Sequence, residues 1–324
     1  MVPDAPVSLR CVWRYITGIA AAAALSFVHH PGSSVRAESR DNNPAAEIDL
    51  GTRGEFASGG PVRSAPIQEG ADSSIEFSAR AGFATDYIYR GTTLSAHQPA
   101  GGATFEAALK IFYAGASVTS VSLPTHPTAE ITATAGVRPK VGKVDFDFSV
   151  TRFYYPGDTV SPGQFAGIEY WEAASRADTK IGELLRLAGG FAYSPNFSNT
   201  GAWSKYAAFG LGIDLPRNAL PHDITASVTG GAGYYWFGNQ SIALGGFPLP
   251  AYLNWNAGVT FTRSRVNLDL RYYDTNLSKE DCFVFTGDPN ATPGGRIDPV
   301  TNPQGLVSRW CSATFVAKFW FQLN

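Results

Sequence analysis

Past the N-terminal region, three histidines are the residues that could supply a general base: His97, His126 and His222. A hydrolase would need one of them beside a nucleophile such as Ser, with a polar group to orient the imidazole ring. Each stands in a stretch that we interpret as a loop or turn, and none precedes a Ser in a predicted strand. We therefore predict no catalytic site and no enzymatic activity.

Metal and cofactor chemistry is not indicated either. The sequence contains no metal-ligand spacing of Cys and His, no alternating-Asp calcium loop and no Gly-rich phosphate loop between a strand and a helix. The formal net charge of −2 gives no basic footprint for nucleic acid. We expect no cofactor, no metal and no nucleic-acid partner.

The N-terminal residues have the pattern of a secretory signal peptide. Arg10 and Arg14 precede an apolar run that ends at Val28. The run is too short for a membrane-spanning helix, which needs about 20 apolar residues. With the small-residue site at Val35-Arg36-Ala37, it predicts a cleaved signal peptide over residues 1–37. The alternative is a buried core helix.

The next segment, residues 38–72, is rich in Gly, Pro, Ser, Ala and charged residues, with Phe56 almost its sole aromatic residue. Such a composition buries too little apolar surface to offset the entropy lost on ordering. We interpret it as a flexible periplasmic leader. The domain assignment is then a signal peptide (1–37), a leader (38–72) and one domain over 73–324.

The two remaining cysteines, Cys282 and Cys311, flank a Gly- and Pro-rich segment, while Cys11 leaves with the predicted signal peptide. An exported protein meets an oxidising compartment, where paired cysteines usually form a disulfide. We predict a Cys282–Cys311 bridge that closes the longest loop. Two free thiols are the alternative.

The domain over 73–324 shows a strand pattern from its first residues. Ile75, Phe77 and the small residues up to Phe83 share one parity, while Glu76, Ser78 and Arg80 take the other. Successive side chains of a strand point to opposite faces, so this is a two-faced strand with an apolar and a polar side. The same alternation recurs over residues 102–110, 114–119, 129–137 and 144–151.

Less regular strands are predicted at 164–174, 183–194, 205–215, 223–236, 251–262, 266–273 and 312–323. Together they make about twelve strands of roughly ten residues, the length that crosses a bilayer when tilted. Short connections, at 139–143, 176–180, 216–223 and 263–265, alternate with long ones, at 91–101, 155–163, 195–204, 237–250 and 274–309. This habit is typical of outer-membrane barrels.

The fold class predicted is therefore all-β: an antiparallel transmembrane β-barrel of the outer membrane. The chain has one Met and no long apolar run past the signal, which excludes a helical membrane protein. Aromatic residues gather at predicted strand ends, as in the girdles at the two membrane interfaces. A soluble periplasmic β-sandwich remains the alternative fold.

A motif at the end of the first strand points to a family. Residues 85–91 read Thr-Asp-Tyr-Ile-Tyr-Arg-Gly and are followed by residues 101–106, Gly-Gly-Ala-Thr-Phe-Glu; the segments 154–157 and 272–276 also match. The sequence resembles the TorF-type porin family, the conserved hypothetical family Gcw_chp. The resemblance implies an outer-membrane barrel that passes small solutes. One departure is the final residue, Asn324, where such barrels usually end in an aromatic residue that is read during assembly.

Asp86 and Arg90 of that motif lie four residues apart on one parity, roughly 13 Å along a strand. They are too far apart to pair with each other, so each needs a partner across the lumen or on an adjacent strand. We predict a charged constriction below the first outer loop; the alternative is two solvated side chains at a strand end.

The function predicted is an outer-membrane, porin-like channel for passive passage of small solutes or ions. Its expected partners are the lipid bilayer, lipopolysaccharide, small solutes and the outer-membrane assembly machinery. A closed structural or adhesive barrel without transport is the alternative. Charges on the polar parity are costly in a membrane unless they face water or a partner, so we assign them to the pore lining. These residues are Glu76, Arg80, Asp86, Arg90, Glu106, Lys110, Glu130, Asp145, Asp147, Arg186, Asp269, Arg271 and Lys318.

Overall fold

The computed structural model describes residues 48–50, 75–161, 164–165, 167–216 and 219–323. They belong to one compact unit, Asn43–Asn324. The predicted signal peptide over 1–37 lies outside the described residues, as does the predicted leader apart from residues 48–50. The assignment of these two segments remains a prediction.

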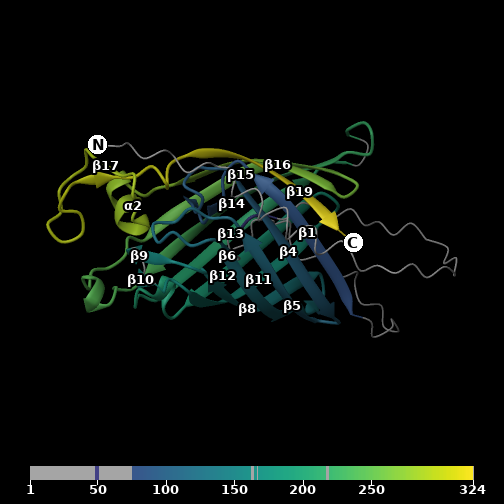
Figure 1. The fold of residues 1–324 in the computed structure, drawn as a ribbon. Helices are drawn as coiled ribbons and strands as arrows, with labels where there is room; N and C mark the ends of the chain where they lie inside the picture. The colour runs from purple at the N-terminus through teal and green to yellow at the C-terminus, as the bar shows by residue number, and fades with distance from the viewer. Residues whose placement is uncertain (1–47, 51–74, 162–163, 166, 217–218, 324) are drawn as a thin grey trace, which may run out of the picture. The chain divides into compact units, whose positions relative to one another are not determined.

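Within the described residues, twelve antiparallel strands form a closed barrel, as the sequence predicts (Figure 1). Each strand pairs with the next along the chain, and the first pairs with the last, so that the barrel has no free edge. In chain order the strands are β1 (Glu76–Ala84), β4 (Ala100–Leu109), β5 (Phe112–Thr119), β6 (Glu130–Val137), β8 (Val144–Tyr154), β11 (Tyr170–Ile181), β12 (Leu185–Ser194), β13 (Ser204–Asp214), β14 (Thr225–Phe237), β15 (Tyr252–Arg263), β16 (Val266–Thr275) and β19 (Thr314–Leu323).

The remaining elements are short. They are β2 (Ile88–Tyr89), β3 (Thr92–Thr93), β7 (Lys140–Val141), β9 (Thr159–Ser161), β10 (Gln164–Phe165), η1 (Phe197–Asn199), η2 (Ile242–Leu244), α2 (Lys279–Thr286), β17 (Thr292–Pro293) and β18 (Leu306–Val307). Apart from β7, they lie in the long loops, which alternate with short turns along the chain as predicted. We call the two ends of the barrel the long-loop end and the short-turn end. Among the described residues, no helix has the length and apolar character needed to cross a membrane.

The wall of the barrel is two-faced, and the first strand shows it in the predicted register. Phe77 and Phe83 point outward and are 62% and 58% exposed, whereas Ser78 and Arg80 are each only 7% exposed. The same alternation places hydroxyl side chains inside on β5 and β6, where Ser117 and Thr132 share a hydrogen bond of 2.6 Å. A lipid-facing exterior and a polar interior follow directly from the period of two.

One predicted strand and its turn are wrong. The sequence pattern favoured a strand over 164–174 and a turn over 176–180, but β11 runs from Tyr170 to Ile181. The charged residues that looked like a turn form a pair on the inner face, with Arg176 Nε 2.6 Å from Asp178 Oδ2. The real turn follows at Gly182, whose φ of 63° suits a residue without a Cβ.

The described leader residues lie inside the barrel. Ile48 and Leu50 are 1% and 2% exposed and pack against Ala188 of β12 and Ala208 of β13. The assignment of residues 38–72 as a leader stays a prediction, and its three described residues contact the inner wall. Two aliphatic side chains in a long polar segment gave too weak a signal to predict the contact.

Candidate functional site

The interior of the barrel brings together most of the charged residues that the sequence assigned to a pore. Buried or nearly buried on the inner face are Arg80, Glu106, Glu130, Asp147, Arg186, Asp269, Arg271 and Lys318. Three others lie at the short-turn end of the barrel instead. Glu76 begins β1 and is exposed, Lys110 is exposed in the turn after β4, and Asp145 pairs with Lys140 in the β7–β8 hairpin.

Opposite charges pair closely on this inner wall. Arg138 donates two hydrogen bonds to the carboxylate of Glu106, at 2.6 and 2.7 Å, and a third to Asp147 at 3.1 Å. Its guanidinium also lies 3.5 Å from the ring centre of Tyr113, whose hydroxyl donates to Asp147. The sequence analysis missed Arg138 because it lies between the predicted strand that ends at residue 137 and the predicted turn over 139–143.

A second group crosses three strands. Arg271 of β16 donates to Asp269 at 2.9 and 3.0 Å, to Asn256 of β15 at 2.6 Å and to Thr229 of β14 at 2.7 Å. Asp269 also accepts a hydrogen bond from Thr260. Bidentate pairs of this kind satisfy both charges and fix their geometry, so the wall is polar but locally neutral.

The long-loop end is filled by the first long loop, residues 85–99, whose β2–β3 hairpin turns at Arg90 and Gly91. The Arg90 guanidinium donates to both carboxylate oxygens of Glu172 in β11, at 2.9 and 2.7 Å. The side chains of this ion pair are 1% and 2% exposed. Arg90 thus finds its partner across the barrel, as expected, but from a loop and not from the strand.

Tyrosines surround this ion pair. The Arg90 guanidinium lies 4.3 to 4.7 Å from the ring centres of Tyr206, Tyr235 and Tyr89. The Tyr252 hydroxyl donates to the Arg90 carbonyl oxygen at 3.1 Å. Cation–π contacts strengthen when the cation is withdrawn from water, so the cage holds the hairpin firmly in the mouth.

Asp86 behaves differently from the prediction, because its bonding partners lie in its own loop. Its carboxylate accepts hydrogen bonds from Thr93 at 2.6 Å and Ser95 at 2.9 Å, and His97 Nδ1 lies 2.6 Å away. The side chain is 4% exposed, which rules out the solvated alternative. Asp86 organises the loop itself because β1 ends at Ala84, two residues before it.

His97 connects this loop to the last long loop. Its Nε2 lies 3.1 Å from the Arg309 carbonyl oxygen, so both ring nitrogens face acceptors. Its hydrogen bond to Asp86 raises the pKa of His97, which favours the imidazolium that can donate to both. In the described part of the chain no hydroxyl or thiol bonds to this ring; Ser95 donates to Asp86 and to the Gln98 carbonyl oxygen. These two contacts of His97 join the first and last long loops as a clamp.

Glu130 is another predicted lumen residue, and it is 1% exposed. Its two carboxylate oxygens accept hydrogen bonds from Tyr87 and Tyr155, each at 2.7 Å. Tyr87 belongs to the first long loop, so Glu130 anchors that loop to the wall. For the described residues there is no group of three or more His, Cys, Asp or Glu side chains that could hold a metal ion.

The predicted disulfide between Cys282 and Cys311 is confirmed. The sulfur atoms lie 2.07 Å apart and the Cα atoms 5.8 Å apart. The bridge joins α2 to the segment before β19, and the Thr275 hydroxyl donates to the Cys311 carbonyl oxygen at 2.8 Å. The last long loop is therefore tied to the barrel rim at both of its ends.

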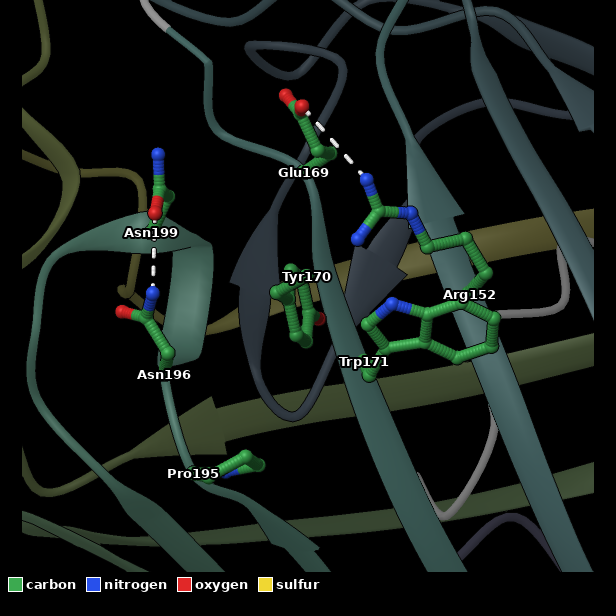
Figure 2. Close-up of a pocket in the computed structure, with 7 residues that line it drawn as sticks. All are labelled: Arg152, Glu169, Tyr170, Trp171, Pro195, Asn196 and Asn199. Carbon is green, nitrogen blue, oxygen red and sulfur yellow. Dashed lines mark hydrogen bonds and ion pairs between the residues drawn. The ribbon is translucent and has the colours of Figure 1, made fainter.

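Figure 2 shows a surface pocket near the start of β11 that the sequence analysis did not anticipate. Its lining residues are Arg152, Glu169, Tyr170, Trp171, Pro195, Asn196 and Asn199. Arg152 lies over the Trp171 ring at 5.3 Å and forms a 3.6 Å ion pair with Glu169, and Asn196 donates to Asn199. These groups largely satisfy one another, so the pocket offers weaker chemistry than the lumen.

The family profile described as "Bacterial protein of unknown function (Gcw_chp)" matches residues 68–292, most of the barrel. The chain belongs to this family. No curated protein matches the sequence. Membership in the Gcw_chp family therefore assigns no activity to the chain.

Solved structures of two porins and an outer-membrane channel match this Gcw_chp chain at low sequence identity. A NanC porin structure matches at 6% identity with a TM-score of 0.43. A KdgM porin in complex with disordered oligogalacturonate matches at 5% identity with a TM-score of 0.41. Each match covers 77% of this chain and 100% of the other chain. An outer-membrane channel from Pseudomonas putida F1 matches at 12% identity and a TM-score of 0.35, over 76% of this chain and 92% of that one.

Proposed function

We propose that the protein is a porin-like channel that lets small solutes or ions pass through the bacterial outer membrane, and that it is not an enzyme. The observation that supports it best is the two-faced wall: aromatic and aliphatic side chains outside, paired charges and hydroxyls inside. Charged side chains within a membrane are expensive unless they meet water or a partner. Charged and hydroxyl side chains along the lumen can form hydrogen bonds with water and solutes that pass through it.

The chemistry of the wall also suggests a narrow and weakly selective channel. A barrel of this strand number encloses little beyond its own side chains, so pore width depends on which segments enter the lumen. Both signs of charge occur, and they pair within the wall, as Arg186 does with Asp214 at 2.8 Å. The pore-lining role of the inward charges is part of this proposal. So are export through a cleaved signal peptide and insertion beside lipopolysaccharide by the assembly machinery.

A closed structural or adhesive barrel is the second candidate, and one observation favours it. Arg90, Glu130 and Asp269 are all less than 5% exposed, so the interior is well filled in this conformation. The channel requires the segments that fill the lumen to move aside, whereas the closed barrel does not. Only the channel predicts a current across a bilayer.

The test uses planar bilayers and a pair of cysteine variants on β5. Ser117 points into the lumen and the adjacent Ala116 points outward. We expect stepwise conductance from the full-length mature protein. A charged, water-soluble thiol reagent should reduce the current of Ser117→Cys and leave that of Ala116→Cys unchanged. Absence of stepwise conductance at every salt concentration and voltage would favour the closed barrel, and equal sensitivity of the two variants would place the current outside the lumen.

A further inference from the structure

The segment Ile48–Leu50 occupies a defined place on the inner wall. Gly210 of β13 provides the space for the two aliphatic side chains, because a Cβ at this position would collide with Ile48. At Gly231 of β14, a Cβ would lie 3.0 Å from the Asp49 carbonyl oxygen. Gly210 and Gly231 stand opposite each other on adjacent strands, and their lack of side chains leaves the space that this segment occupies.

Polar groups of the wall bind the backbone of this segment. Arg176 Nη1 donates to the Ile48 carbonyl oxygen at 3.1 Å, and Asn256 Nδ2 donates to the Asp49 carbonyl oxygen at 3.0 Å. The Asn256 side chain is itself held by Arg271. These donors belong to wall strands, so they are already in place when the segment enters.

The Asp49 carboxylate meets the most specific partners. Tyr273 of β16 donates its hydroxyl to Asp49 Oδ2 at 2.8 Å, and Lys318 Nζ of β19 lies 3.7 Å from the same oxygen. Lys318 also donates to the Tyr273 hydroxyl at 2.6 Å, so the two wall residues are joined in one chain of hydrogen bonds. An ammonium and a phenol that converge on one oxygen are a typical binding arrangement for a carboxylate.

Asp269 of the wall does not neutralise the charge of Lys318. Asp269 stands opposite Lys318 in the β16–β19 register, but both of its oxygens are bonded by Arg271. When Asp49 withdraws, Lys318 and Tyr273 remain fixed on neighbouring strands and face the lumen. The arrangement then favours another anion of suitable shape.

We infer that Tyr273 and Lys318 form a carboxylate-binding site on the lumen wall, filled here by Asp49 and available to a small aliphatic carboxylic acid once the leader is displaced. The inference deepens the proposed channel function by naming a substrate class, small organic acids. A tethered ligand binds at an effective concentration of about millimolar or above, so a free carboxylate competes at comparable concentrations.

A cysteine pair reports the occupancy of the groove without any recording of current. In the full-length mature protein, Ile48→Cys combined with Gly210→Cys should form a disulfide on mild oxidation, seen as linked peptides by mass spectrometry. The matched control combines Ile48→Cys with Phe209→Cys, since Phe209 is the outward-facing neighbour of Gly210 and is 56% exposed. It should form no link. Absence of the first link, or equal yields of both, would overturn the inference.

Competition then tests the carboxylate site. Butyrate should slow formation of the link several-fold, whereas butyramide and sodium chloride at equal ionic strength should not. Lys318→Gln should abolish the difference between butyrate and butyramide, and Lys318→Arg should restore it. Equal effects of butyrate and butyramide, or of butyrate and chloride, would overturn the site. Formation of the disulfide link can be measured whether or not the barrel conducts. A barrel that does not conduct would therefore contradict the proposed channel function without contradicting the carboxylate site.

Discussion

Among the described residues, the first long loop and the leader segment Ile48–Leu50 both lie in the lumen of this barrel, and they are held in different ways. The first long loop places Arg90 in a cage of tyrosines with a bidentate bond to Glu172, and short connections to β1 and β4 tether it on both sides. The leader segment reaches the wall with three described residues, and its one acidic side chain pairs with Lys318 at 3.7 Å. Arg90 of the loop is 3% exposed, and Ile48 and Leu50 of the leader are 1% and 2% exposed.

The comparison shows that burial alone does not distinguish a fixed part of a lumen from an exchangeable one. The number of contacts, their geometry and the length of the tether decide how easily a segment leaves. The loop in the mouth is a permanent constriction by these criteria, and the leader is a replaceable ligand. The following predictions test this difference, beginning with the largest effect.

Removing the partner of Arg90 should have the largest effect. Glu172→Ala leaves a buried cation without its counter-charge, and we expect a loss of about 3–5 kcal/mol in the free energy of unfolding. Asp49→Ala is the matched change in the leader and should cost about 1 kcal/mol or less, because its ion pair with Lys318 is looser, at 3.7 Å. Chemical unfolding in detergent micelles measures both. Equal losses would remove the distinction between the two segments.

The disulfide at the rim should stabilise the long-loop end alone. Its cysteines are 29 residues apart, and closing a loop of that size contributes about 3–4 kcal/mol in the chain-entropy model. The double variant Cys282→Ser with Cys311→Ser should make the last loop sensitive to protease while the strands stay protected. Mass spectrometry of the unreduced wild-type protein should find the two peptides linked. Alkylation of both cysteines without reduction would contradict the bridge.

The two-faced wall that both segments contact can be tested at adjacent positions of β1. Ala79 faces outward and Ser78 faces the lumen. An arginine on the lipid face near the bilayer centre costs ~2–4 kcal/mol, and much less in the lumen. Ala79→Arg should therefore lower the yield of folded, heat-modifiable barrel more than Ser78→Arg. Equal yields would show that the register is wrong.

The smallest effect concerns pH and the clamp between the first and last long loops. The hydrogen bond to Asp86 raises the pKa of His97, so the imidazolium stabilises the folded loops. This contribution is complete below the ordinary pKa of about 6.5 and is lost as pH rises through the raised value. Amide hydrogen exchange in residues 93–99 should speed up over that range beyond its ordinary pH dependence, and His97→Gln should remove the excess. The ring is 35% exposed, so solvent screening keeps the effect modest.

The barrel itself could be predicted because a period of two over ten residues is a strong signal. Failures came where charge interrupted that period: Arg176 and Asp178 suggested a turn, yet they pair on the inner face of β11. Hydrophilic residues are natural inside a polar lumen, so polarity does not separate a turn from a wall here. The error arose because the turn was assigned from local polarity, whereas the pairing of β11 with its neighbouring strands decides where the strand ends.

The site was harder to predict than the fold. The inward charges followed from parity, but their partners did not, because Glu172 lies 82 residues from Arg90 and Asp49 lies more than 200 from Tyr273. Sequence spacing carries no information about such pairs without the closed topology. The contribution of Ile48–Leu50 could not be anticipated at all, since its composition resembles that of its surroundings.

The most direct test of the account records current from the Ile48→Cys, Gly210→Cys barrel in planar bilayers. With the leader locked to the wall by oxidation, we predict little or no stepwise conductance, and a clear rise after a reductant is added. Ile48→Cys alone controls for opening of the Cys282–Cys311 bridge and should show no such rise. The same conductance in the locked and reduced states, or none in either, would contradict a channel whose lumen is occupied by its own segment Ile48–Leu50.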